Sequence, residues 1–308
     1  MRTALAMTMA RPAWWVMALA AFLVRGGFVL VLLPLINLPS VSSLATTLAP
    51  PIETLVLSRQ SLEGALIGTV LISTLVGLLA AAGLAGSWLD LALLREAGDA
   101  DEHDSNVPFV EPSAWRAFGV RLAAHLPTFL ALAYATVRIV IVTYEELLSP
   151  GDSTIPLVAR VTAGAQDAIA LVVVTWLLGE TVGGLAARRS AAGEPIGRAL
   201  RSAVRDLLGR RGVATLVVSN AVVVVAGVLL VTVVGRAAEH VRAYLLDGAA
   251  DVPLAAALLL LISAWILCLA VLAAALAWRA TAWTVEAGRP RPAPAAAIAL
   301  LSEEAPIT

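Results

Sequence analysis

The 308-residue sequence has no lysine, one cysteine and three histidines, and only 14% of its residues are charged. A single cysteine excludes an intramolecular disulfide framework, and so few histidines and cysteines argue against a zinc site. The net charge of −1 argues against a nucleic-acid partner. No nucleophile elbow, HExxH, P-loop or Rossmann fingerprint is present, so we expect no cofactor, no metal and no enzyme. An intramembrane acid–base enzyme using Glu180 and Asp167 is the remaining enzymatic alternative.

The sequence is rich in apolar residues. They make up 60% of the chain, and the mean hydropathy is +0.89. Soluble domains are about half apolar and about a quarter charged, so a chain of this composition could not cover its apolar surface with polar groups in water. We therefore predict an all-α fold, a polytopic integral membrane helix bundle.

Six apolar runs reach the roughly 20 residues that a membrane-spanning helix needs. A cleaved signal peptide is the alternative for the first run, but that run continues past Arg25 to Leu38, too long for a signal sequence. Asp90 lies just beyond the second run, and short interfacial helices are predicted at 40–60 and 235–248. The predicted spans are about 13–35, 64–88, 121–144, 163–187, 213–234 and 252–278.

Arginine positions predict the orientation, because loops on the cytoplasmic side are enriched in positive charge. With both termini inside, 15 arginines lie at cytoplasmic segments and four at external ones. Six of the eight tryptophans then fall at predicted cytoplasmic ends, where interfacial aromatic residues are common. We expect a multi-pass protein of the cell membrane with cytoplasmic N- and C-termini.

Three segments outside the spans have distinct compositions. Residues 95–112 form an acidic cytoplasmic loop without calcium-loop spacing, and 288–308 form a C-terminal tail. Residues 194–211 are predicted to form a basic amphipathic cytoplasmic helix, because apolar residues recur on one face. Its Arg198, Arg201 and Arg205 lie off that face and are predicted to contact lipid headgroups.

The same helix suggests an alternative role as a docking surface for a cytoplasmic partner. Importer permeases of ATP-driven transporters carry a helix of this kind in a cytoplasmic loop. This segment resembles that helix only in its position. Their glutamate-alanine-alanine signature is not reproduced in "GEPIGRALRSAV". Membrane lipids, a second copy of the chain or a protein at the cytoplasmic face are the expected partners.

Four charged residues fall within predicted spans, where an unpaired charge costs about 2.5 to 3.5 kcal/mol on insertion scales. At a rise of about 1.5 Å per residue, Arg25 and Glu180 lie at similar depths, and so do Arg138 and Asp167. We therefore predict two buried pairs, Arg25 with Glu180 and Arg138 with Asp167.

Glycines beside these charges suggest close helix packing. Gly26 and Gly27 follow Arg25, while Gly179 and Gly183 flank Glu180 in the small-xxx-small spacing that membrane helices use for packing. The second span carries the same spacing at Gly64 and Gly68. The first and fourth spans are therefore predicted to touch near their charges.

Two functions fit these features. One is transport of a small solute or handling of a lipid through a polar intramembrane site. The other is a non-catalytic scaffold, or a subunit of a larger complex including a transporter permease, in which the ion pairs only hold helices together. The sequence does not identify a substrate.

Overall fold

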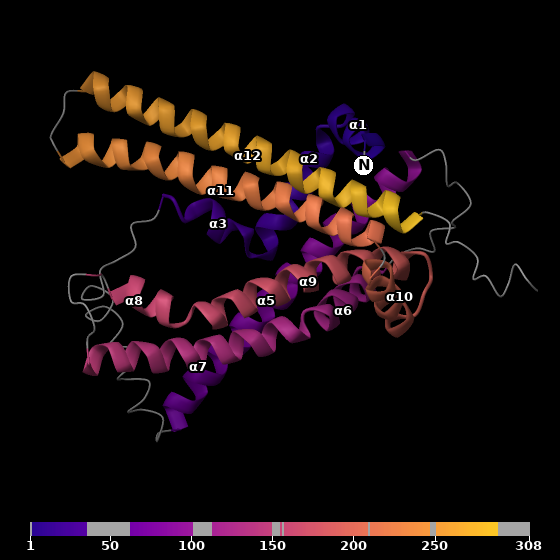
Figure 1. Ribbon diagram of the computed structural model, residues 1–308, viewed down its shortest axis with the longest axis horizontal. Helices are drawn as coiled ribbons and strands as arrows, with labels where there is room; N and C mark the ends of the chain where they lie inside the picture. Colours follow the sequence, from indigo (N-terminus) through magenta and orange to yellow (C-terminus); the bar gives the residue numbers. More distant parts are fainter. Residues whose placement is uncertain are drawn as a thin grey trace, which may run out of the picture.

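The computed structural model is built from helices that form one elongated bundle (Figure 1). The predicted helices at 40–60, most of the acidic loop and nearly all of the C-terminal tail lie outside the described residues. The described residues contain no β-strand. They are 2–35, 62–100, 113–149, 155, 157–208, 210–246 and 251–288.

The chain begins with several short helical segments and ends with two long helices. Between α2 and α3 lies a π-helical segment, η1. The elements in order are α1 (Arg2–Ala10), α2 (Ala13–Phe22), η1 (Leu23–Gly27), α3 (Phe28–Leu32), α5 (Leu62–Ala100), α6 (Ala114–Ala124), α7 (Leu126–Leu148), α8 (Leu157–Gly164), α9 (Gln166–Ala191), α10 (Ile196–Leu208), α11 (Arg210–Leu246) and α12 (Asp251–Gly288).

Six helical segments are long and apolar enough to cross a membrane, which agrees with the predicted number and order of spans. Exposed apolar side chains such as Val225, Leu259 and Leu267 on α11 and α12 suit a lipid-facing surface. The six segments are Ala13–Leu32, Gly68–Ala97, Leu126–Glu146, Gln166–Ala191, Val213–Leu246 and Val252–Val285.

Several boundaries differ from the predicted ones. Helix α5 continues twelve residues past the predicted end at 88, because "LDLALLREAGDA" contains strong helix formers and no proline. The third predicted span is divided at His125: α7 begins at Leu126, and Pro127 in its first turn lacks the amide hydrogen needed to continue α6. The fourth is divided between α8 and α9 at Ala165. The separate helix expected at 235–248 is instead the end of α11.

The long helices pack in pairs, α11 along α12 and α7 along α9 (Figure 1). Apolar side chains from α2, α3, α5, α11 and α12 form the largest core cluster, including Trp14, Val31, Leu93, Leu230 and Leu272. Helix α1 and helix α10 lie near the same end of the bundle, which we call the basic end.

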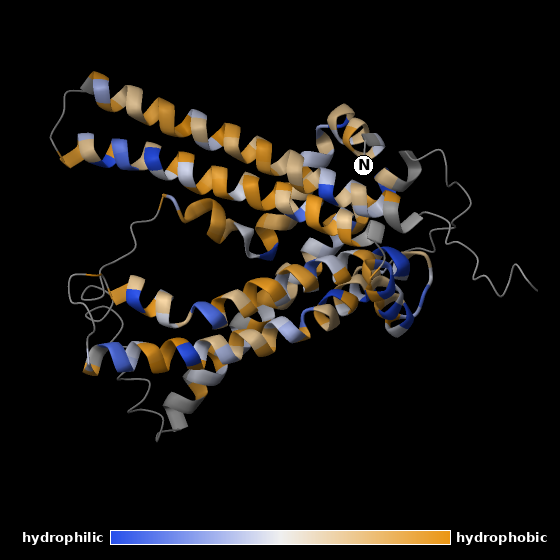
Figure 2. Cartoon of the chain, in the orientation of Figure 1, coloured by the Kyte–Doolittle hydropathy of each residue, from blue (hydrophilic) through white to orange (hydrophobic). Residues whose placement is uncertain are grey.

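Helix α10 covers the basic end and is largely hydrophilic beside the apolar α11 and α12 (Figure 2). Its Ala199 and Ala203 are completely buried against residues including Val120 and Trp283. This part of the apolar face therefore packs on protein, whereas the predicted helix places the whole face on the membrane. Its three predicted headgroup-binding residues are exposed: Arg198, Arg201 and Arg205.

Candidate functional site

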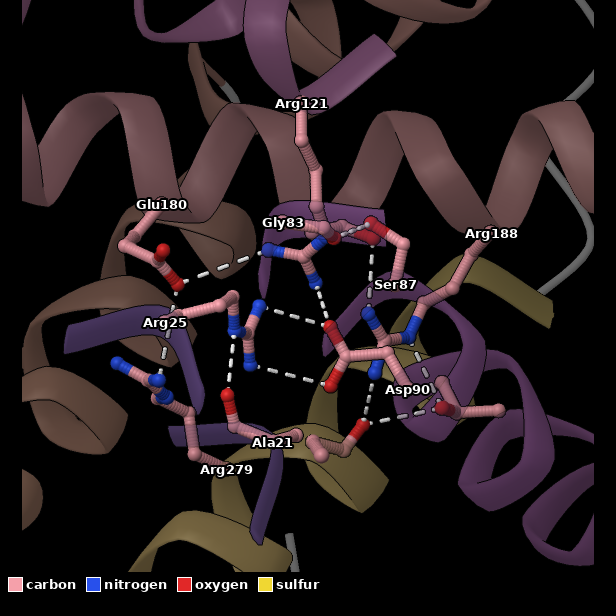
Figure 3. A network of polar contacts seen from close by, with 12 residues as sticks. Ala21, Arg25, Gly83, Ser87, Asp90, Arg121, Glu180, Arg188 and Arg279 are labelled. Carbon is pink, nitrogen blue, oxygen red and sulfur yellow. Dashed lines mark hydrogen bonds and ion pairs between the residues drawn. The ribbon is translucent and has the colours of Figure 1, made fainter. Parts of the chain in front are cut away.

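Seven ionisable side chains from different parts of the chain meet inside the bundle, and Figure 3 labels all of them except His125. They come from five regions that lie tens of residues apart in the sequence. We call this group the arginine cluster. Its members are Arg25 of η1, Asp90 of α5, Arg121 of α6, His125 between α6 and α7, Glu180 and Arg188 of α9, and Arg279 of α12.

The π-helical segment positions Arg25. Its Nε donates to the carbonyl oxygen of Ala21 at 2.9 Å, so the side chain lies back along the preceding turn. Gly26 follows with φ of +101°, a conformation that glycine adopts far more readily than residues with a side chain. The helix is kinked there, and π-helical turns of this kind are frequent at functional sites.

Arg25 forms a two-pronged ion pair with Asp90. Its Nη1 donates to Oδ2 at 2.8 Å and its Nη2 to Oδ1 at 3.2 Å. The stem of Arg25 crosses α5 at Gly86, where an added Cβ would lie 2.7 Å from the Arg25 Cγ. Glycine at this position therefore lets the arginine lie flat against the helix that carries its partner.

Asp90 also accepts a hydrogen bond from Nη2 of Arg121, so one carboxylate bridges two guanidinium groups (Figure 3). Arg121 is 9% exposed. Its Nε and Nη1 are buried and have no hydrogen-bond partner, although Nη1 lies 3.7 Å from Glu180 Oε2. Two donors of a buried cation are thus left for another acceptor.

Glu180 faces three cationic or potentially cationic groups from three parts of the bundle. Its Oε2 is 3.7 Å from Arg121 Nη1 and 3.8 Å from Arg279 Nη2, and its Oε1 is 3.6 Å from His125 Nε2. These separations are longer than hydrogen bonds. Glu180 therefore balances the surrounding charge without closing the space between the side chains.

Arg188 and Arg279 are held mainly by neutral groups. Arg188 donates to Thr284 Oγ1 at 2.9 Å and to the carbonyl oxygens of Gly184 and Ala280 at 2.8 and 2.7 Å. Arg279 Nη1 donates to Asn220 Oδ1 at 3.3 Å. These arginines also lie over the ring of Trp283, which packs so closely on α9 that a Cβ at Gly184 would be 2.4 Å from it.

His125 closes one side of the cluster at the junction of α6 and α7. Its Nδ1 lies 2.9 Å from the carbonyl oxygen of Arg121, and its Nε2 faces Glu180. Burial alone lowers the pKa of His125, but the nearby negative charge of Glu180 outweighs this effect and raises the pKa above its usual value. A proton on His125 is therefore held more tightly than on a free imidazole.

All members of the cluster except His125 line a small cavity of about 20 Å³. One water molecule needs about 10 to 15 Å³ by this measure, so the cavity can hold water or a small ion. Four arginines outnumber two carboxylates around it, giving a formal charge of +2 with His125 neutral. An anion is the charge type that this excess favours.

The predicted pairings differ from those observed. Arg25 pairs with Asp90, because α5 continues past the predicted span and brings Asp90 alongside η1. Glu180 has its ion-pair contacts with residues of α6, α12 and the α6–α7 junction, and Arg25 acts on it through its charge without a direct ion pair. Arg138 donates to the carbonyl oxygen of Gly164 at 3.3 Å, and Asp167 accepts from Tyr134 Oη at 3.4 Å. The break between α8 and α9 provides the free carbonyl group that Arg138 contacts.

The predicted packing glycines fall into two groups. Gly179 and Gly183 lie against α6, where an added Cβ would be 3.0 Å from the His125 ring and 3.3 Å from Ala124 Cβ. They bring α9 close to the third predicted span and not to the first, contrary to our expectation.

The remaining glycines contribute little to helix packing. Gly27 contacts its own Phe22, whereas a Cβ added at Gly26 or Gly68 would have nothing within 4 Å. Gly64 lies in α5, but its side-chain surroundings are outside the described residues.

Five cluster residues are not predicted as site residues, because they lie near the ends of predicted spans. In that position the side chains are expected to face the membrane interface or the aqueous phase: Asp90, Arg121, His125, Arg188 and Arg279. The available signal for Asp90 is the uninterrupted helical pattern around it. Within the described residues, no group of three His, Cys, Asp or Glu side chains could hold a metal ion.

The cluster therefore combines several guanidinium donors, two fixed counter-charges and a cavity of restricted size. Arginine forks match the oxygens of phosphate and carboxylate groups. Comparison with protein-family models, with curated proteins and with solved structures finds no match, so these residues are the basis for any functional assignment.

Proposed function

We propose that this chain is an integral membrane protein that binds a small oxyanion in the arginine cluster and transports it across the membrane. The observation that carries the proposal is Arg121, a buried guanidinium with two unpartnered donors in a pocket of net positive charge. The ligand class is a phosphate- or carboxylate-type group, either free in solution or part of a lipid headgroup.

The arrangement of charges supports binding over a purely structural role. A buried cation is costly unless it is paired and hydrogen-bonded, and a structural network would gain by satisfying all its donors. Here Arg188 has no carboxylate within ion-pair distance among the described residues, and Arg121 leaves two nitrogens free. An oxyanion would supply both the missing charge and the missing acceptors.

The position of the cluster supports transport. The cluster lies between membrane-length helices, where an ionisable group is expected to mark a path for a polar solute. Its helices include η1, whose kink interrupts the first span at the site, and discontinuous helices are common at the binding sites of transporters.

The test is anion uptake by purified protein in liposomes, with sulfate and phosphate as probes. Arg121→Lys keeps a positive charge beside Asp90 but removes the guanidinium donors. We expect this variant to show at least tenfold slower anion uptake and at least tenfold weaker equilibrium binding than wild type. Arg201→Lys, on the exposed face of α10, is the matched control and should behave as wild type.

Binding of a lipid headgroup would give a different pattern from binding of a free anion. In that case none of the soluble probes would be taken up, but phosphatidylglycerol in the liposomes would remain bound during purification, and Arg121→Lys would release it. If neither soluble anions nor anionic lipids bind, the proposed function is wrong.

A scaffold or complex subunit is the second candidate. It is favoured by the way the cluster joins η1, α5, α6, α9 and α12 through ion pairs and hydrogen bonds. Such a protein should co-purify with a stoichiometric partner, show no flux, and lose stability without losing any ligand when Arg121 is changed to lysine.

A further inference from the structure

We propose that His125 and Glu180 hold one exchangeable proton that is taken up together with the anion, so that anion binding is coupled to protonation. This inference rests on the proposed function and specifies its regulation. It starts from the two contacts that His125 makes, one on each ring nitrogen.

The first contact determines which nitrogen titrates. Nδ1 lies 2.9 Å from the backbone carbonyl oxygen of Arg121, and a carbonyl oxygen can only accept a hydrogen bond. Nδ1 therefore carries hydrogen in both the neutral and the charged imidazole. The proton that comes and goes is on Nε2.

The second contact places Nε2 opposite a carboxylate. It lies 3.6 Å from Oε1 of Glu180. If Nε2 were bare and Glu180 ionised, two lone pairs would face each other in a buried site, which is unfavourable. A proton between them removes this conflict, and the raised pKa of His125 agrees with that arrangement.

The proton site is connected to the anion site through Glu180. The charged groups around the pair are Arg121 on α6 and, on the far side of Glu180, Arg279 on α12, with Arg25 of η1 also acting on Glu180 through its charge. Protonated His125 would raise the formal charge of the cluster from +2 to +3. An anion bound in the cavity would in turn stabilise that proton, because linkage between two sites is reciprocal.

His125 also has the access that proton exchange requires. Its side chain is 16% exposed, and it lies where α6 ends and α7 begins, beside Gly179 of α9. The cavity can hold water next to Glu180. A proton can therefore reach the pair through Glu180 without separation of the long helices.

Sulfate is a suitable probe because its charge stays constant between about pH 5 and pH 8, the range in which histidine titrates. With one linked proton, sulfate affinity should fall as pH rises above the pKa of His125, by at most about tenfold per pH unit. His125→Gln should bind sulfate with little dependence on pH. In liposomes, wild-type sulfate uptake should carry protons inward, detected with an internal pH dye.

The chain offers a matched control in His240. Its Nδ1 makes the same contact with a carbonyl oxygen four residues earlier, at 2.8 Å from Arg236, but it lies on the exposed part of α11. His240→Gln should keep the full pH dependence. If His125→Gln fails to fold, nuclear magnetic resonance of labelled histidine in the wild type provides the second measurement: sulfate should raise the pKa of His125.

The outcomes separate the two proposals. Sulfate binding that is strong but independent of pH in the wild type, with no sulfate effect on the His125 resonance, overturns the coupling and leaves the proposed function standing. Absence of binding by every anion and anionic lipid at every pH overturns both. Loss of pH dependence in His240→Gln and not in His125→Gln would also refute the assignment.

Discussion

The carboxylate of Asp90 is predicted to be the most sensitive charge in the cluster. Asp90→Asn keeps the shape of the side chain but removes the negative charge that serves both Arg25 and Arg121. Only 19% of the Asp90 side chain is exposed, so the loss leaves two guanidinium groups without compensation in a largely buried place. Breaking one side of a buried ion pair costs about 3 to 5 kcal/mol, and we expect a destabilisation in that range.

Removing Arg25 should cost less than removing the charge of Asp90. In Arg25→Met, Asp90 keeps its hydrogen bond from Arg121, so the carboxylate is still paired. The expected loss is about 1.5 to 3 kcal/mol, the value of hydrogen bonds to charged groups. The free energy of unfolding of the double variant should be close to that of Asp90→Asn alone, because the Arg25–Asp90 pair is already broken in that single variant.

The assay is equilibrium unfolding of the purified variants in mixed detergent micelles. Glu96→Gln is the matched control on the same helix: Glu96 is exposed, and glutamine keeps an oxygen that can accept the 2.7 Å hydrogen bond from Trp14 Nε1. It should change stability by less than about 0.5 kcal/mol. The reasoning is refuted if Arg25→Met is as damaging as Asp90→Asn, or if the two effects add in the double variant.

Three further predictions test the packing, the titration and the topology. Gly184→Ala should lower the free energy of unfolding by about 1 to 3 kcal/mol, because the new Cβ would lie 2.4 Å from Trp283. Gly68 has open space around it, so Gly68→Ala should leave stability unchanged or raise it by up to about 1 kcal/mol in the same assay. The pKa of His125 is raised in the folded protein, so protonated His125 should stabilise the fold fully below about pH 6.5, and this contribution should be lost as pH rises through the folded pKa. The free energies of unfolding of wild type and His125→Gln should therefore become equal at high pH. Reporter fusions after residues 105, 195 and 305 should all report the cytoplasmic side, and an external signal at 195 would contradict the predicted orientation.

Composition and hydropathy are sufficient to predict the helical class and the number of membrane-length helices. Both predictions depend on hydropathy averaged over about 20 residues, and one misplaced helix boundary does not change such averages. Pro12 also locates the start of the first span, since α2 begins at Ala13. The helix α10 can be recognised from its apolar period, although its contacts with Val120 and Trp283 depend on tertiary packing that a periodic pattern does not contain.

The pairing of charges could not be predicted in the same way. Depth along each span favours Glu180 as the partner of Arg25, but it excludes Asp90 when the second span is taken to end at 88. An error of a few turns in one helix is therefore enough to hide the residue that Arg25 contacts. The depth of a residue also does not give the direction in which its side chain leaves the helix. That direction is the reason why Asp167 contacts Tyr134 and not Arg138.

The same error affects how arginines are used to predict orientation. Arg121, Arg188 and Arg279 count as cytoplasmic charges in the sequence, yet each is at most 9% exposed and contacts other residues of the bundle. Without these three, twelve arginines remain at predicted cytoplasmic segments against four outside, so the bias keeps its direction. The three that are removed are the ones that give the cavity its excess positive charge. A charge near the end of an apolar run can thus either face water and orient the chain or turn inward and form a site. Packing glycines accompany the second case here, since Gly183 lies against Arg121 and Gly184 against Arg188.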